Sequence, residues 1–300
     1  MQLDLLFYYF QKRKIIIMNL KMFFTVVLIF FVCNFVFSQT SMDFNKSGIE
    51  KTDKGDFKGA IDDYTKALSS DAKNADIYYN RGIAYLKGKI DIEKAVADFS
   101  KAIEIKPDLV ASYFNRGIAY DVLKQYEKAM VDYSKAIEKK PDFTEAYNYR
   151  GILYSKRMQD FESSIPDFDK AIELKNDFAE AFANRAYSFR KLKVFDKAIA
   201  DYTKAIEIKT DNADWYFNRG LTYYDMKDYK NGLVDYDKTI ELNSKYASAY
   251  YNRGITKFMV NDEKGGCEDW AKALELGDNN AKEVIEKYCQ PKQEEQQKQQ

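Results

Sequence analysis

The chain has 300 residues, long enough for one large core or for several repeated units. Its 47 Lys and Arg residues balance 47 Asp and Glu residues, which argues against nucleic-acid binding, because proteins of that class usually carry a basic surplus. The absence of His excludes His-based catalysis and His-ligated metals, and three Cys are too few for a four-Cys zinc site.

The N-terminal segment has the pattern of a secretory signal. Residues 22–37 contain no charged residue, follow Lys21 and end before Ser38. We therefore predict a signal peptide at residues 1–38, a mature chain that begins at Gln39, and export to the periplasm or the cell surface.

The start of this signal and its removal leave two alternatives. Residues 18–38 already have the pattern of an ordinary signal peptide. If Met18 is the initiator, residues 1–17 are not part of the protein and Met1 is a mis-assigned start. An uncleaved anchor is the alternative to cleavage, although 16 apolar residues fall short of the roughly 20 that span a bilayer. This segment is the only one for which we expect contact with a membrane.

Short strings of residues recur along the rest of the chain. One string reads Asn-Arg-Gly, with small variations, and its arginines lie 34 or 35 residues apart: Arg81, Arg116, Arg150, Arg185, Arg219 and Arg253. A second string keeps step with the first and reads Ala-Val-Ala-Asp-Phe-Ser-Lys-Ala-Ile-Glu at residues 95–104, with close copies at 129–138 and 198–207. A fixed period of this length is typical of repeat proteins.

The period and its residues resemble the tetratricopeptide repeat, a helix–turn–helix unit of about 34 residues. Residues 110–143 carry its small and aromatic positions throughout: Tyr113, Gly117, Tyr120, Ala129, Tyr133, Ala136 and Pro141. The spacing i, i+4, i+7 puts these residues on one face of each of two helices. The resemblance covers seven segments: 41–74, 75–109, 110–143, 144–178, 179–212, 213–246 and 247–280. It implies an all-α fold, a right-handed solenoid of helix pairs over residues 39–290.

Three segments depart from the pattern. The second segment is one residue longer than the repeat, and we place the extra residue in the turn near Lys89 and Ile90. In the fourth segment Pro166 stands within the second helix, so we expect that helix to start late or to kink. In the sixth segment Gly232 replaces Ala, at a cost of about 0.5–1 kcal/mol.

The end of the chain predicts a cap and a tail. Residues 280–289 read as one more helix with a polar outer face, and residues 291–300 as a disordered Gln-rich tail. Cys267 and Cys289 lie eleven residues on either side of Asp278, so both reach the same height on antiparallel neighbouring helices. We predict a disulfide between them in an oxidising compartment; two unrelated thiols are the alternative.

Two charged positions recur with the repeat. The six arginines occupy position 7, and position 23 is Asp in all seven segments: Asp63, Asp98, Asp132, Asp167, Asp201, Asp235 and Asp269. Because the guanidinium fork matches a carboxylate, we favour pairing along the stack. The alternative is an arginine ladder that binds an acidic ligand.

The resemblance also implies a binding surface, since the first helices of such repeats line a concave groove. Carried onto this chain, positions 5 and 6 predict a partner-binding set: Tyr79, Asn80, Phe114, Asn115, Asn184, Phe217, Asn218, Tyr251 and Asn252. Asn amides can donate to and accept from an extended peptide. The alternative role for these Asn residues is a hydrogen bond between the two helices of one repeat. The clamp with which some relatives hold a terminal carboxylate is incomplete, because position 2 is acidic or small.

No phosphate-binding Gly loop or other catalytic motif is present. We therefore expect an exported, non-enzymatic scaffold that binds a peptide or protein in the groove, without cofactor, metal or nucleic acid. The alternatives are a structural subunit of a cell-envelope complex that uses its convex face or ends, and a cell-wall glycan-binding module. The sequence names neither the partner nor the oligomeric state.

Overall fold

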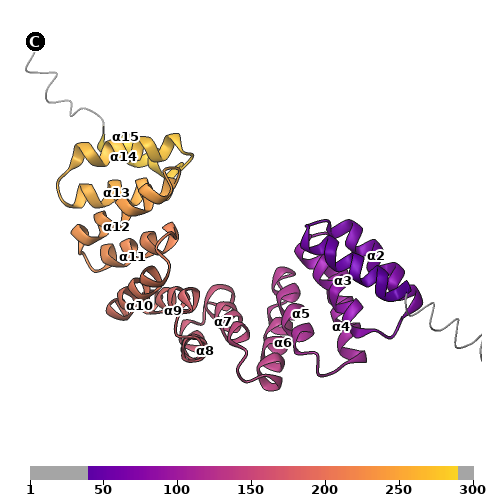
Figure 1. The fold of residues 1–300 in the computed structure, drawn as a ribbon. Coiled ribbons are helices and arrows are strands. Elements are labelled where there is room, and N and C mark those ends of the chain that lie inside the picture. The colour runs from indigo at the N-terminus through magenta and orange to yellow at the C-terminus, as the bar shows by residue number, and fades with distance from the viewer. Residues whose placement is uncertain (1–39, 290–300) are drawn as a thin grey trace, which may run out of the picture. The chain divides into compact units, whose positions relative to one another are not determined.

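The computed structural model describes residues 40–289, which form helices and turns and contain no strand (Figure 1). The predicted signal peptide and the Gln-rich tail lie outside the described residues. The all-α fold expected from the sequence is confirmed. Within residues 40–289, no helix is long and apolar enough to cross a membrane, and no group of acidic or Cys side chains could hold a metal ion.

The helices divide into two compact units. The N-terminal unit, residues 40–139, begins with a helix at residues 40–53 and continues as α2 (Phe57–Ser70), α3 (Ala75–Lys87), α4 (Ile92–Ile105), α5 (Val110–Val122) and α6 (Tyr126–Lys139). The helix at residues 40–53 and α2 form the first predicted repeat, α3 and α4 the second, and α5 and α6 the third.

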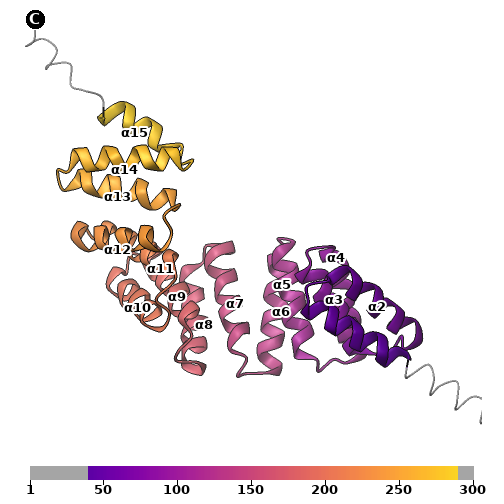
Figure 2. The same cartoon turned by 45° about the horizontal axis from the view of Figure 1, so that its top comes forward.

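The C-terminal unit, residues 140–289, holds the other repeats and the cap. Its helices are α7 (Thr144–Ile152), the π-helical turn η1 (Leu153–Met158), α8 (Phe161–Leu174), α9 (Ala179–Lys191), α10 (Phe195–Ile208), α11 (Ala213–Asp225), α12 (Tyr229–Leu242), α13 (Ala247–Met259), α14 (Glu263–Glu275) and α15 (Asn280–Tyr288). The last three stack side by side (Figure 2). The division between the two units falls after α6, the second helix of the third predicted repeat.

Each repeat packs a buried aromatic ring of its second helix against a small residue of its first. These rings are at most 2% exposed: Tyr64, Phe99, Tyr133, Phe168, Tyr202, Tyr236 and Trp270. A Cβ atom on Gly117 would lie 2.7 Å from the ring of Tyr133, which explains why the close approach of α5 and α6 requires glycine.

The two longest repeats absorb their extra residue differently. In the second repeat it lies in the connection between α3 and α4, at residues 88–91. In the fourth repeat the first helix widens into η1, and the left-handed residue that ends it, Gln159, stands one position later than its counterpart Lys124 in the third repeat. A π-turn of this kind accommodates one inserted residue without shifting the helices that follow.

The expectation that Pro166 delays the second helix of the fourth repeat is wrong. The helix α8 begins at Phe161, five residues before Pro166, and has the same length as α6. Pro166 removes one backbone donor, but Glu162 and Pro166 are both exposed, so water can satisfy the carbonyl that loses its partner.

The cap helix α15 packs on α14 and is joined to it covalently. Cys267 and Cys289 form a disulfide with their Cα atoms 5.7 Å apart, within the usual span of such a bond. Both cysteines border a cluster that includes Trp270 and Ala281. The bond therefore fixes the last helix over the end of the hydrophobic core.

Candidate protein-binding surface

The repeated arginines are bound within the fold. Arg116 Nε and Nη2 each donate to one carboxylate oxygen of Asp132, at 2.8 Å. The same fork recurs with distances of 2.6–2.8 Å in five other pairs: Arg81–Asp98, Arg150–Asp167, Arg185–Asp201, Arg219–Asp235 and Arg253–Asp269. The pairing expected from the sequence is confirmed.

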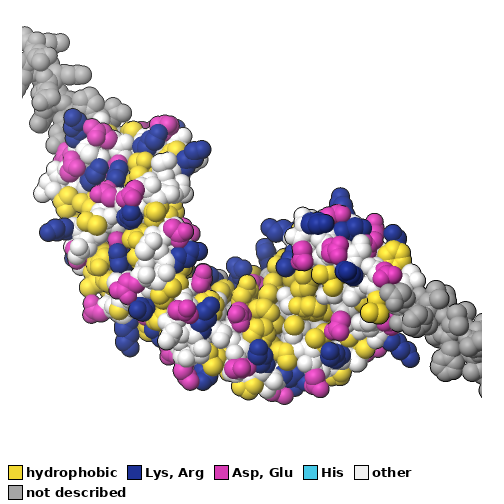
Figure 3. All heavy atoms as spheres, viewed as in Figure 1, with side chains coloured by type: hydrophobic (Ala, Val, Ile, Leu, Met, Phe, Trp, Pro, Cys, Tyr) yellow, Lys and Arg dark blue, Asp and Glu magenta, His cyan; other side chains and the backbone are white. Residues whose placement is uncertain are grey.

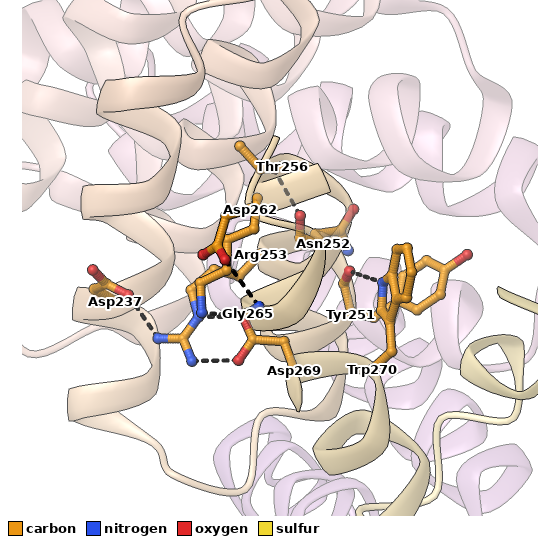
Figure 4. Close-up of polar contacts among 10 residues, drawn as sticks. Asp237, Tyr251, Asn252, Arg253, Thr256, Asp262, Gly265, Asp269 and Trp270 are labelled. Carbon is orange, nitrogen blue, oxygen red and sulfur yellow. Dashed lines mark hydrogen bonds and ion pairs between the residues drawn. The ribbon is translucent and has the colours of Figure 1, made fainter. Parts of the chain in front are cut away.

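The third nitrogen of the guanidinium reaches the preceding repeat. Arg253 Nη1 donates to Asp237 at 2.6 Å while its fork holds Asp269 (Figure 4). Equivalent bonds join Arg81 to Thr65, Arg116 to Ser100, Arg185 to Asp169 and Arg219 to Thr203. Each of these arginines thus connects three helices, which leaves little of its hydrogen-bonding capacity for an external ligand.

The first repeat lacks the arginine, and a serine and a lysine contact its Asp instead. Ser47 Oγ and Lys51 Nζ both contact Asp63, each at 2.6 Å. Burial alone would raise the pKa of Asp63, but these two donors outweigh it and hold the pKa below its ordinary value. At Asp235 burial outweighs the Arg219 fork, and the pKa is raised.

The first helices of successive repeats form one surface in each unit, which we call the first-helix face. In the N-terminal unit it comprises residues 40–53, α3 and α5, and in the C-terminal unit α7, α9, α11 and α13, where neighbouring members are in contact. In Figure 3, cationic and acidic side chains are interspersed with hydrophobic ones over the visible surface of both units.

Three of the predicted Asn residues of this face bond between repeats. Asn80 donates to Asn45 of the preceding first helix at 3.3 Å, and Asn184 to Asn148 at 3.2 Å. The alternative, a bond between the two helices of one repeat, is therefore wrong for these two residues. Three residues donate to a carbonyl four residues earlier in their own helix: Asn115, Asn218 and Asn252. Asn115 also donates to the Tyr79 hydroxyl at 3.3 Å.

The predicted aromatic residues of the face are half-buried. The rings of Tyr79, Phe114 and Phe217 each lie 5.9 Å from the buried ring of their own repeat. Tyr251 packs beside Trp270, whose indole Nε1 donates to the Tyr251 carbonyl at 3.1 Å (Figure 4). Tyr79, Asn80, Phe114 and Asn115 thus share the face of the N-terminal unit, and the other five predicted residues lie on that of the C-terminal unit.

The structure brings together a group of cations that the sequence pattern does not mark, at the C-terminal ends of the first helices in the fourth and fifth repeats. We call it the basic rim: Lys156, Arg190, Lys191 and Lys193. Lys156 Nζ and Lys191 Nζ lie 5.9 and 5.4 Å from the ring centroid of Tyr187. A pocket of about 510 Å³ is lined by Arg190, Lys191 and Lys193 of this rim, together with Phe195 and Asp225.

Comparison with known proteins gives the family. Models described as TPR repeat or tetratricopeptide repeat match residues 48–88 and 187–227, 110–143 and 213–246, and 75–109 and 144–178. No curated protein sequence matches the chain significantly.

Solved structures share the fold. A tetratricopeptide repeat protein from Parabacteroides merdae is 22% identical with a TM-score of 0.63, over 84% of this chain and all of that one. PilW, a type IV pilus biogenesis factor, is 18% identical with a TM-score of 0.64, over 70% of this chain and 98% of its own. YrrB, described as a TPR protein with an unusual peptide-binding site, is 23% identical with a TM-score of 0.53, over 63% of this chain and 97% of its own.

The family matches together span residues 48–178 and 187–246, more than half of the chain, and they cover helices of both units. The protein therefore belongs to the tetratricopeptide repeat family, whose fold is a scaffold for protein–protein interaction.

Proposed function

We propose that this protein is an exported, non-enzymatic scaffold that binds a peptide or protein segment on its first-helix face. The observation that carries the proposal is a row of apolar side chains at position 9, each partly exposed. They are Ile49, Ile83 and Ile118 in the N-terminal unit and Ile152, Tyr187, Leu221 and Ile255 in the C-terminal unit. Partly exposed apolar rows beside amide groups suit an extended polypeptide.

Two variants test which face is used. Ile118→Ala with Leu221→Ala removes two positions of the apolar row, and Val131→Ala with Val234→Ala is the matched control. Val131 and Val234 are 66% and 60% exposed on the second helices α6 and α12. Tagged versions are used to isolate partners from the native cell envelope, and binding of the isolated partner is then titrated.

We expect the first pair to weaken binding by about 2 kcal/mol for each anchor that acts as a hot spot, and the control pair to leave it unchanged. The opposite pattern would favour the alternative of an envelope subunit that uses its convex face or ends, which the two second-helix valines sample. Retention on cell-wall glycan, with no polypeptide isolated, would favour the glycan-binding alternative.

Export is supported by the predicted signal and by the Cys267–Cys289 disulfide, since such bonds persist in oxidising compartments. We expect mass spectrometry of the native protein from the periplasm or cell surface to find Gln39 at its N-terminus. We also expect no reactive thiol in the denatured mature chain. An intact Met1 or Met18, or two reactive thiols, would contradict export with cleavage.

A further inference from the structure

Most cations that recur with the repeat are neutralised inside it. The arginines are held by their Asp partners, and each second helix from α4 to α14 pairs a Lys with the Glu three residues later at 2.6–3.2 Å: Lys101–Glu104, Lys135–Glu138, Lys170–Glu173, Lys204–Glu207, Lys238–Glu241 and Lys272–Glu275. Charges that recur in this way are explained by the architecture. A cluster of charges that occurs at only one place in the described chain needs a separate explanation.

The basic rim is such a cluster. Lys156, Lys191 and Lys193 form no ion pair within the described chain, and the one acid of the pocket, Asp225, is held by Arg190 at 2.9 Å. Two ammonium groups share the Tyr187 ring, and the pocket beside them also offers the apolar ring of Phe195. The rim therefore combines excess positive charge, an aromatic surface and an open volume of about 510 Å³.

The electrostatics at Lys156 favour an incoming anion. Lys156 is exposed as a residue, but packing around its ammonium group, and then repulsion from Arg157, lower its pKa, and the nearby carboxylate of Asp214 offsets this only in part. A ligand carboxylate at this place would stabilise the charged ammonium and shield it from its neighbour.

The residues of the rim also depart from the repeat pattern. Lys156 stands on η1, a π-turn, and such turns often mark functional positions. The second repeat has Lys87 and Lys89 at the same positions as Lys191 and Lys193 but has Ile83 and Leu86 in place of Tyr187 and Arg190. The aromatic surface and the arginine, rather than lysines alone, distinguish the fifth repeat.

The opposite edge of the same face indicates the chemistry of the partner. Glu145 and Glu180 lie at the N-terminal ends of α7 and α9, and Glu180 is eleven residues, or about 16 Å, from Lys191 along α9. A nucleic-acid backbone that crossed this face would meet these acids. A polypeptide can instead place acidic side chains at one edge alone.

We propose that the basic rim binds an acidic segment of the partner polypeptide, with carboxylates at Lys156, Lys191 and Lys193 and an apolar side chain against Tyr187 and Phe195. This inference rests on the proposed function, because it names the chemistry of the segment that the first-helix face would bind. It adds that binding depends on the partner's negative charge and weakens with salt.

The test uses the full mature chain and a labelled peptide of four Glu-Leu-Gly repeats, with Gln-Leu-Gly and Lys-Leu-Gly counterparts. Binding is followed by fluorescence anisotropy at low and moderate salt. We expect the Glu peptide to bind at least tenfold more tightly than either counterpart, and its Kd to rise with salt. Equal binding of the Gln peptide, or no binding of the Glu peptide, would overturn the inference, as would tighter binding of an oligothymidylate.

A matched pair of variants locates the site. Lys191→Glu with Lys193→Glu reverses the rim, and Lys87→Glu with Lys89→Glu makes the same changes at the same repeat positions of the N-terminal unit. Lys193 and Lys89 share a left-handed backbone, so strain from the substitution is matched. We expect the first pair to raise the Kd of the Glu peptide at least tenfold and the second to change it less than threefold; equal effects would overturn the inference.

Two further measurements separate the possible failures. Lys156→Gln repeats the test if the rim double variant fails to fold, and an unchanged Kd for this variant would count against the inference. If the Gln peptide binds as well as the Glu peptide and is lost in the Ile118→Ala, Leu221→Ala variant, the rim inference fails and the proposed function stands. If no peptide binds the first-helix face, both fail.

Discussion

The Arg116 side chain connects three helices of the N-terminal unit: its own α5, α6 through Asp132, and α4 through Ser100. Asp132 is only 3% exposed, so its carboxylate depends on the guanidinium for compensation. Removing one partner and leaving the carboxylate buried and unpaired destabilises the fold by more than the intact pair contributes to its net stability. Each Arg–Asp pair is therefore a position at which a single substitution destabilises the helix stack.

Arg116→Ala should lower the free energy of unfolding by about 2–3 kcal/mol, because it leaves Asp132 buried and unpaired. Urea denaturation measures the change, and Arg116→Ala with Asp132→Asn should recover part of it. The exposed Lys128→Ala serves as control. Unchanged stability together with lost binding of an acidic partner would instead support the arginine ladder as a ligand site.

Replacing either of two glycines of the sixth repeat with alanine should change the stability of the fold, but in opposite directions. A Cβ on Gly232 meets nothing closer than 3.4 Å, so Gly232→Ala should stabilise the helix α12 by about 0.5–1 kcal/mol. A Cβ on Gly220 would lie 2.9 Å from the ring of Tyr236, which is fully buried, so Gly220→Ala should destabilise by about 1–3 kcal/mol. Thermal unfolding of both variants checks the signs, and a stabilised Gly220→Ala would contradict this packing.

Helix N-termini give the chain an acid-sensitive component. The backbone N–H of Lys94 holds the pKa of Asp91 below its ordinary value, and hydrogen bonds from Ser163 do the same for Asp160. Groups with a depressed folded pKa contribute stability above the unfolded pKa of about 4 and lose it as the pH falls through the folded value.

Asp91→Asn with Asp160→Asn keeps the capping oxygens but removes these titrations. We expect the wild type to have the higher Tm at about pH 6 and the gap to narrow toward about pH 2. Asp235, whose pKa is raised, changes stability in the opposite direction but equally in both proteins. A gap that is the same at both pH values would show that the two caps do not titrate as inferred.

At the scale of elements, α15 is nine residues long and buries only Ala281 fully, so packing alone holds it weakly. The disulfide joins positions 22 apart in sequence, and loop-closure entropy assigns it about 3 kcal/mol. Its contribution should be confined to the end of the C-terminal unit.

Cys289→Ser should therefore release α15 while the rest of the chain stays folded. We expect faster amide hydrogen exchange at Asn280–Tyr288 and unchanged exchange in α9 and α11. Lys287→Ser, an exposed substitution on the same helix, is the control. Equal protection of α15 in Cys289→Ser and wild type would mean that the bond does not fix the cap.

Several elements could be predicted from the sequence because they repeat. Gly117, Tyr133 and their counterparts recur at one spacing, and that spacing determines helix pairs, their packing faces and the pairing of Arg116 with Asp132. The place of η1 could not be predicted, because an inserted residue can enter a helix or a turn at similar cost.

At the scale of the whole molecule, features that occur once were the hardest to predict. The division after Lys139 has no composition shift or linker to mark it. The basic rim combines Lys156 with residues more than thirty positions away, and only the fold brings them to one ring. From their position in the repeat, such residues are expected only at the solvated ends of helices.

Partner recognition by the first-helix face can be examined in living cells. Site-specific photocrosslinking in the native cell tests it most directly, with the crosslinker placed singly at Ile118, Leu221, Val131 or Val234. We predict that Ile118 and Leu221 capture one and the same polypeptide and that Val131 and Val234 do not. Capture of that polypeptide only from Val131 and Val234 would contradict recognition by the first-helix face.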